Sequence, residues 1–213
     1  MSSLHASSTI IPPPRDERAG KGWVLGWMSS NGILPLERVS KIDPDAFKLR
    51  MPEWSIYQKH SVEVAGSRTH AESSYIAEIA QNIAMNNGMD VWVDGSLRNW
   101  LWYKEALQRI RQRYPHYRIA IVAIDASEDM IERNIQKRAK MTGRHISNEL
   151  REASSQGVER GLRELTHLVD LIAIVRNSLS AAPGEAISEP TLRSVSMVDR
   201  SGNWDLIGVL TNK

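Results

Sequence analysis

The hydrophobic positions of this chain change spacing several times, from helical periodicity to short continuous runs. The clearest helical stripe lies within residues 70–86, where apolar residues recur three and four positions apart at Ile76, Ile79, Ala80, Ile83 and Ala84. This spacing predicts an amphipathic helix that turns the stripe toward the core. Thr69 and Glu72 have the spacing of a capping box at the start of this helix, and Gly88 is expected to end it.

Short apolar runs of strand length stand between segments of helical spacing. Strands are predicted at residues 39–42, 91–93, 118–124 and 169–175, and helices at residues 21–30, 127–141 and 147–168. A further helix is predicted to place Tyr103, Ile110 and Tyr114 on one face. A hairpin over residues 199–210 is expected to follow. Strands that alternate with helices predict an α/β fold, with a doubly wound, mainly parallel sheet flanked by helices on both faces.

Length and composition narrow the class of protein. The 213 residues fit one domain over residues 20–213, and the Ser- and Pro-rich residues 1–19 are predicted to be disordered. The chain has no cysteine, no apolar run long enough to cross a membrane and no secretory signal, so a cytoplasmic protein is expected. A net charge of +2 gives no argument for nucleic acid, and the basic runs at 109–113 and 137–140 fit solvated helix faces better.

Two carboxylates follow the first predicted strand, in Asp43-Pro44-Asp45. Polar groups at the carboxyl ends of parallel strands are where α/β proteins bind ligands. One of these carboxylates could accept the proton of an attacking hydroxyl group. Alternatively, Asp45 caps a helix that begins at Ala46.

The strand at residues 91–93 is followed by Asp94, and Ser96 and Arg98 come shortly after it. A carboxylate at this position is a candidate Mg²⁺ ligand, and Ser96 and Arg98 could bind a substrate. The alternative is a structural turn in which Ser96 or Asn99 caps the next helix.

Gly20, Lys21 and Gly22 have the form of a phosphate-binding loop that has lost part of its motif. In such a loop the backbone amides surround phosphate and the lysine neutralises it. Here Arg15 occupies the position of the first glycine, and residues 9–11 are the only strand material before it. A surface lysine after a glycine is the simpler interpretation of these residues alone.

Two arginines late in the chain are candidates for a phosphate clamp. Arg138 follows Ile131 and Ile135 at helical spacing, and Arg144 lies in the loop beyond. Together they resemble a kinase lid. Glu78, by contrast, lies opposite the apolar stripe of its helix, so periodicity alone predicts that it faces water.

These segments together resemble the zeta-toxin family of P-loop kinases, over about residues 20–211. The matching stretches are residues 41–48, residues 51–54, residues 65–73, residues 91–98, Arg138, residues 142–144 and the hairpin at residues 199–210. The resemblance implies a P-loop NTPase-type fold and an ATP-dependent phosphotransferase that uses Mg²⁺. Its substrate would be a small molecule with an acceptor hydroxyl, such as a nucleotide sugar, since bacterial members phosphorylate UDP-N-acetylglucosamine.

Roles carry over from the family by position. The resemblance implies that Asp45 is the general base and that Lys21, with Gly20 and Gly22, is the remnant of the phosphate-binding loop. Arg138 and Arg144 would clamp ATP phosphates. Asp94 remains the Mg²⁺ candidate because of its place at the end of a strand. The substrate pocket would be lined by Asp43, Glu78, Ser96 and Arg98.

The residues expected to bind the nucleotide depart most from the family pattern. Arg15 replaces a glycine, and Gly22 stands where a Mg²⁺-binding hydroxyl residue is usual. Two functions therefore remain open: an active kinase, or a non-catalytic relative that keeps the fold as a ligand-binding or protein-interaction module.

Overall fold

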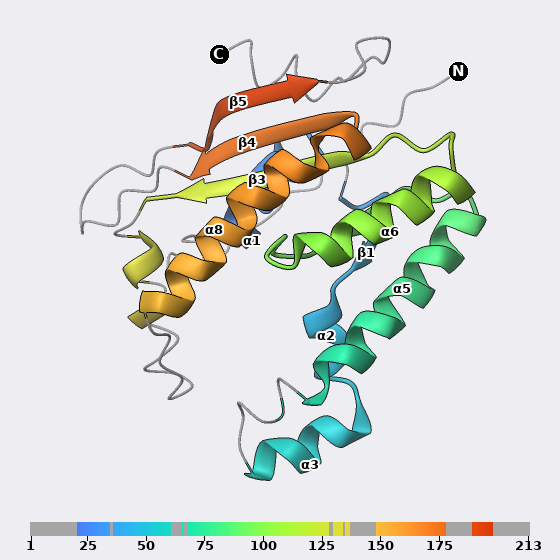
Figure 1. Cartoon of the computed structure of the whole chain (residues 1–213), viewed down its shortest axis with the longest axis vertical. Coiled ribbons are helices and arrows are strands. Elements are labelled where there is room, and N and C mark those ends of the chain that lie inside the picture. The colour runs from blue at the N-terminus through green and yellow to red at the C-terminus, as the bar shows by residue number, and fades with distance from the viewer. Residues whose placement is uncertain are drawn as a thin grey trace.

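The structure is a computed structural model, and it describes residues 21–34, 36–60, 65, 68–127, 130–133, 135–136, 148–177 and 189–197. The predictions for residues 1–19, for most of the helix at 127–141 and for the hairpin at 199–210 lie outside these residues. Within them, helices and strands alternate along the chain as expected for an α/β protein (Figure 1).

Among the described residues, the first half of the chain forms α1 (Lys21–Ser30), β1 (Ser40–Ile42), α2 (Pro44–Lys48), α3 (Pro52–His60), α5 (His70–Asn86) and β2 (Val91–Val93). The second half forms α6 (Trp100–Arg113), β3 (Ala120–Ala126), α8 (Asn148–Leu165), the 3₁₀ turn η2 (Thr166–Leu168), β4 (Leu171–Asn177) and β5 (Thr191–Met197). The strands predicted at residues 39–42, 91–93, 118–124 and 169–175 all form, although β3 and β4 begin two residues later than their apolar runs.

The described strands form two sheets. β1 and β2 pair in parallel, with Ile42 opposite Val93. β3 pairs in parallel with β4, which pairs antiparallel with β5. Parallel pairing is thus confirmed, but a single continuous sheet is not present among the described residues. Residues 9–11, which the sequence offers as strand material, lie outside the described part.

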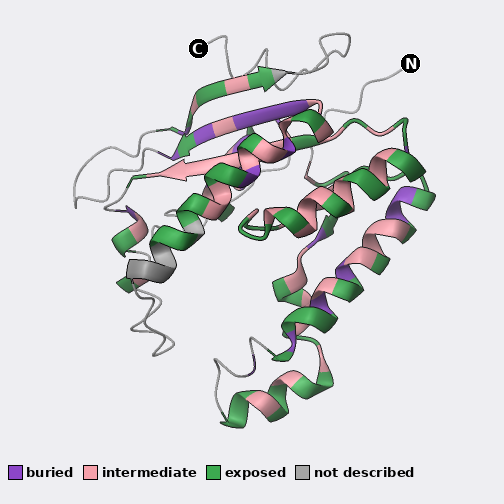
Figure 2. Ribbon diagram, in the orientation of Figure 1, coloured by how far each residue is buried: buried purple, intermediate pink, exposed green. Residues whose placement is uncertain are grey.

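The main core lies between α1 and the three-stranded sheet. Val24 and Met28 of α1 are fully buried and pack with Val175 of β4. β4 is the most buried strand (Figure 2), as its continuous apolar sequence predicted. Gly32, whose φ is +69°, follows the helix in the left-handed region that favours glycine, so the predicted end of α1 at Asn31-Gly32 is confirmed.

The predicted core stripe of α5 is correct at Ala84, which is buried, but wrong for its three isoleucines. Ile76, Ile79 and Ile83 are 39%, 45% and 58% exposed. The buried face instead holds smaller side chains and one methionine: Ser73, Ala77, Ala84 and Met85. Since α5 packs against α2 and the short strands β1 and β2, small residues let the backbones approach closely. Periodicity identified the helix but not the face that is buried, because α5 has apolar residues on two sides.

The predicted capping box at the start of α5 is also wrong. The Thr69 side chain makes no cap hydrogen bond, and its backbone has helical dihedral angles. Its hydroxyl instead donates to the carbonyl oxygen of Ala65, at 2.7 Å. Thr69 therefore ties α5 to the residue one turn before it.

Candidate active site

The carboxyl ends of β1 and β2 lie side by side and carry the two acidic segments that the sequence singled out. The backbone amide of Asp94 donates to the carbonyl oxygen of Ile42 at 2.8 Å, which extends the pairing one residue beyond the strands. Asp43 and Asp94 therefore leave the sheet at the same edge, where ligands bind in α/β proteins.

Asp43 caps α2. Its Oδ1 accepts from the backbone amides of Asp45 and Ala46, at 3.0 and 3.3 Å, and Pro44 occupies the first turn. The alternative in which Asp45 is the helix cap is therefore wrong. An N-cap carboxylate satisfies amides that have no partner within the helix, and proline at this place loses nothing because its missing donor is not needed.

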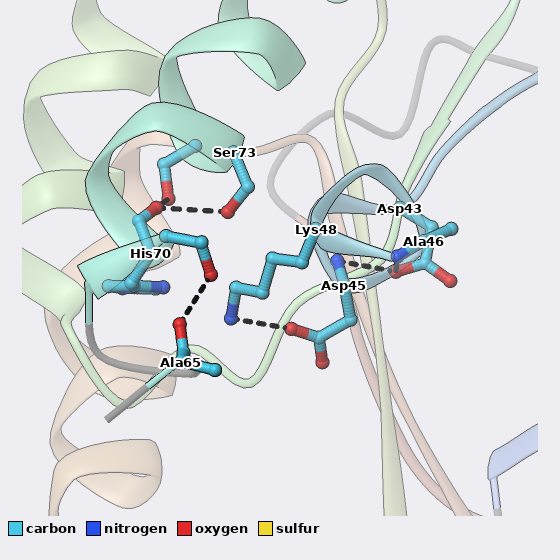
Figure 3. A network of polar contacts seen from close by, with 9 residues as sticks. Asp43, Asp45, Ala46, Lys48, Ala65, His70 and Ser73 are labelled. Atoms are coloured by element: carbon cyan, nitrogen blue, oxygen red, sulfur yellow. Dashed lines mark hydrogen bonds and ion pairs between the residues drawn. The ribbon is translucent and has the colours of Figure 1, made fainter. Parts of the chain in front are cut away.

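Capping by Asp43 leaves the Asp45 carboxylate free of the backbone. Its Oδ1 accepts from Lys48 Nζ at 2.8 Å, and its side chain is 86% exposed (Figure 3). The hydrogen bond from Lys48 lowers the pKa of Asp45 below its ordinary value, and the charges of His70 and Lys21 act in the same direction, against partial burial. Asp45 is thus held ionised at the edge of the protein.

Lys21, the first residue of α1, forms an ion pair with Oδ1 of Asp94. The lysine side chain is about half exposed, whereas Asp94 is largely buried. The charge of Lys21 also reaches Asp45. The structure therefore pairs Lys21 with Asp94 and places Asp45 within range of the charge of Lys21.

The loop after β2 is strained. Leu97 has a φ of +55°, which is uncommon for a residue with a branched side chain. A Cβ atom at Gly95 would overlap the hydroxyl of Tyr103, so any other residue there would require the Tyr103 side chain to move. Ser96 Oγ accepts weakly from the Arg98 amide at 3.5 Å, and Asn99 makes no side-chain cap bond to α6. Strain of this kind concentrates at functional loops.

Glu78 does not face water as periodicity predicted. It accepts from Trp102 Nε1 at 3.1 Å and lies 3.7 Å from Arg109, so it points from α5 toward α6. There it lines a cleft of about 370 Å³ between the two helices. Neither Asp45 nor Asp94 lines that cleft.

Several predicted residues cannot be placed. Gly20, Arg138 and Arg144 lie outside the described residues. Gly22 is described and lies within α1, and a Cβ there would meet no neighbouring atom.

The donor set fits a magnesium–nucleotide complex in part. Lys21 supplies a cation for phosphate oxygens, and Asp94 supplies a carboxylate of the kind that Mg²⁺ prefers. Among the described residues there is no cluster of three or more metal-ligating side chains. This is compatible with Mg²⁺ sites that use one or two carboxylates plus substrate phosphates.

Two residues near Asp45 were missed by the sequence argument. Lys48 binds its carboxylate, and His70 lies close enough to influence its pKa. The spacing of Asp45 and Lys48, three positions apart in a helix, was an available signal. His70 gave no signal, since only packing of α2 against α5 brings it near.

The fold and this edge first define a class of protein. Alternating helices and parallel strand pairs, with a lysine at a helix start beside a strand-end aspartate, fit an α/β protein of the P-loop NTPase type. A solved chain from the PezAT chromosomal toxin–antitoxin system of Streptococcus pneumoniae has a similar fold. The two superpose with a TM-score of 0.54 at 14% sequence identity, over 90% of this chain and 73% of the other.

The family follows from the sequence itself. Residues 17–182 match the family model described as zeta toxin, so the chain belongs to the zeta toxin family. The resemblance drawn from the motifs is confirmed. A comparison with curated proteins gives no match. No helix among the described residues is both long enough and apolar enough to cross a membrane.

Proposed function

We propose that the chain is an ATP-dependent phosphotransferase that acts on a hydroxyl group of a small molecule, such as a nucleotide sugar. The observation that carries this proposal is the ion pair between Lys21 and Asp94 at the edge of β1 and β2, from which α2 with Asp45 also begins. Family membership supports it, because zeta toxins are P-loop kinase-like proteins.

In the proposed reaction, Asp45 accepts the proton of the acceptor hydroxyl. The hydroxyl oxygen forms a bond to the γ-phosphorus of ATP, the bond from that phosphorus to the bridging oxygen breaks, and ADP leaves. Lys21 neutralises charge on the outer phosphate oxygens. Bound Mg²⁺ would add to this neutralisation, with Asp94 as its protein ligand.

The remaining residues have binding roles in the proposal. Arg138 and Arg144 clamp the phosphates, and Gly20 and Gly22 permit the backbone to approach them. Ser96, Arg98 and the Asp43 oxygen that does not cap α2 bind the acceptor. Glu78 lines a separate cleft, so it contacts only an acceptor long enough to extend toward α6, as a nucleotide sugar is.

The second candidate is a binding module without catalysis. It is favoured by one observation, the loss of the first glycine and of the hydroxyl residue around Lys21. Positioning and charge neutralisation supply most of phosphoryl-transfer catalysis, so a deformed loop would be costly. The similar structure comes from a toxin–antitoxin system, which supports extending this candidate to a protein partner.

A phosphate-transfer assay separates the two candidates. The full chain is incubated with Mg²⁺, ATP labelled at the γ-phosphate, and UDP-N-acetylglucosamine as the acceptor probe. The kinase proposal expects transfer by the parent and a loss of at least about 100-fold in Asp45→Asn, with Glu53→Gln, an exposed carboxylate on α3, unchanged. Equal transfer by parent and Asp45→Asn would contradict the role of Asp45.

A further inference from the structure

The ion pair between Asp45 and Lys48 has an unusual distribution of exposure. The Lys48 side chain is only 13% exposed, whereas the Asp45 side chain is 86% exposed. Lysine normally keeps its ammonium in water, and desolvating it is costly unless a partner compensates. Here the compensating acceptor is Oδ1 of Asp45, the only one found for Lys48 among the described residues.

Because Lys48 is largely buried and Asp45 is exposed, the two residues have different roles. A pair of two exposed side chains contributes little and holds neither in place. A lysine fixed by its surroundings can instead hold an exposed carboxylate in one orientation. In Figure 3 the Lys48 side chain extends from α2 toward the start of α5, and its Nζ ends at the Asp45 carboxylate.

We propose that Lys48 is a positioning residue for the general base: it binds Oδ1 of Asp45 and thereby presents Oδ2 to the acceptor hydroxyl. The proposal rests on the function proposed above, and it assigns a role to a residue that the family resemblance left without one. In the described part of the chain, Oδ2 of Asp45 has no hydrogen-bond partner.

The local structure gives Lys48 the rigidity that this role requires. It is the last residue of α2, a helix of five residues that is too short to be stable alone. The Asp43 cap fixes the start of this helix, and packing against α5 fixes its side. Both partners of the pair are therefore carried by one small unit held at two points.

The chemistry of phosphoryl transfer fits a positioned base better than a strong one. The Lys48 hydrogen bond lowers the pKa of Asp45, helped by His70 on α5 and Lys21 on α1, so the carboxylate is ionised but weakly basic. In a loose transition state the acceptor proton is transferred late, so orientation of the carboxylate matters more than its basicity. A misplacement of about 1 Å can reduce the rate about 100-fold.

Three variants of Lys48 test this role. Lys48→Met keeps the length and packing of the side chain but removes the donor and the charge. Lys48→Arg keeps the donor and the charge. Lys59→Met, on the exposed end of α3, controls for the loss of a lysine. Thermal unfolding is measured first, to confirm that each variant is folded.

The kinetic result expected is a fall of about 10- to 100-fold in the kcat of Lys48→Met. KM for ATP and acceptor should change little, Lys48→Arg should recover part of the loss, and Lys59→Met should equal the parent. A kcat for Lys48→Met within a factor of two of the parent would overturn the proposal, and so would a loss that Lys48→Arg does not reduce.

A second measurement needs no turnover and separates this proposal from the kinase proposal. The Asp45 carboxyl carbon is titrated by NMR in the parent and in Lys48→Met. Because the pair lowers the pKa of Asp45, its removal should shift the titration to higher pH. An unchanged titration overturns the role of Lys48 even if the parent is an active kinase. A parent that transfers no phosphate but shows the shift would overturn the kinase function and this role in catalysis, leaving the contact itself demonstrated.

Discussion

Lys21 and Asp94 are 73 residues apart in the sequence, yet their side chains form an ion pair between the first residue of α1 and the end of β2. A lysine that binds phosphate and an aspartate that binds Mg²⁺ must lie close together if both are to contact the same Mg-ATP complex. The pair links the incomplete phosphate-binding motif around Lys21 to the end of β2, which was clearly visible in the sequence.

The first prediction concerns the stability that this pair contributes. Because Lys21 is about half exposed, solvent screens the attraction. We expect Asp94→Asn to change the free energy of unfolding by less than about 1 kcal/mol, as measured by urea denaturation. Lys21→Met should cost more, about 1–3 kcal/mol, because it leaves the largely buried Asp94 carboxylate without this ion-pair partner. A larger loss in Asp94→Asn than in Lys21→Met would mean that the carboxylate is part of the structural framework rather than of a ligand site.

The second prediction concerns Asp43. Its cap bonds to Asp45 and Ala46 should make Asp43→Ala less stable by about 1 kcal/mol, whereas Asp43→Ser, which can still cap, should unfold close to the parent. Activity measured on the same two variants separates capping from substrate binding. A loss of activity in Asp43→Ala alone would support the capping role. A loss of activity in both variants would support a contact between Asp43 and the acceptor.

The third prediction concerns the exposed isoleucines of α5. Ile83 is 58% exposed and Val175 is fully buried. We expect Ile83→Ala to cost less than about 1 kcal/mol and Val175→Ala to cost about 2 kcal/mol or more. If the two variants lose equal stability, the outer face of α5 is covered in solution and the description of α5 is wrong.

The fourth prediction concerns Asn177, at the end of β4. It is 1% exposed, and among the residues that the structure describes neither its side-chain oxygen nor its nitrogen has a hydrogen-bond partner. An unpaired buried polar group costs about 1–3 kcal/mol. Asn177→Leu, which has nearly the same shape, should therefore raise the midpoint of urea denaturation. A lower midpoint would show that the amide has a partner in solution, such as a buried water molecule.

The order of elements and the type of fold could be predicted from the sequence because they depend on local patterns. The helix at residues 21–30 and the strand at residues 91–93 form as predicted, since periodicity and breaking residues act within a few positions. The buried face of α5 could not be predicted, because its apolar residues surround the helix and only tertiary packing selects among them.

The candidate site was predictable only in part, for a similar reason. Asp45 and Asp94 were found because strand ends are visible in the sequence, and Lys21 because it follows a glycine. The cap by Asp43 rather than Asp45, and the turn of Glu78 toward Trp102, depend on backbone and helix contacts that no spacing encodes.

The central claim is that the edge formed by Lys21, Asp45 and Asp94 binds a nucleotide. Calorimetric titration of the full chain with Mg-ATP tests it most directly, with Lys21→Ala as the matched variant. The account predicts measurable binding by the parent and its loss in Lys21→Ala. No binding by the parent, or equal binding by both proteins, would contradict it.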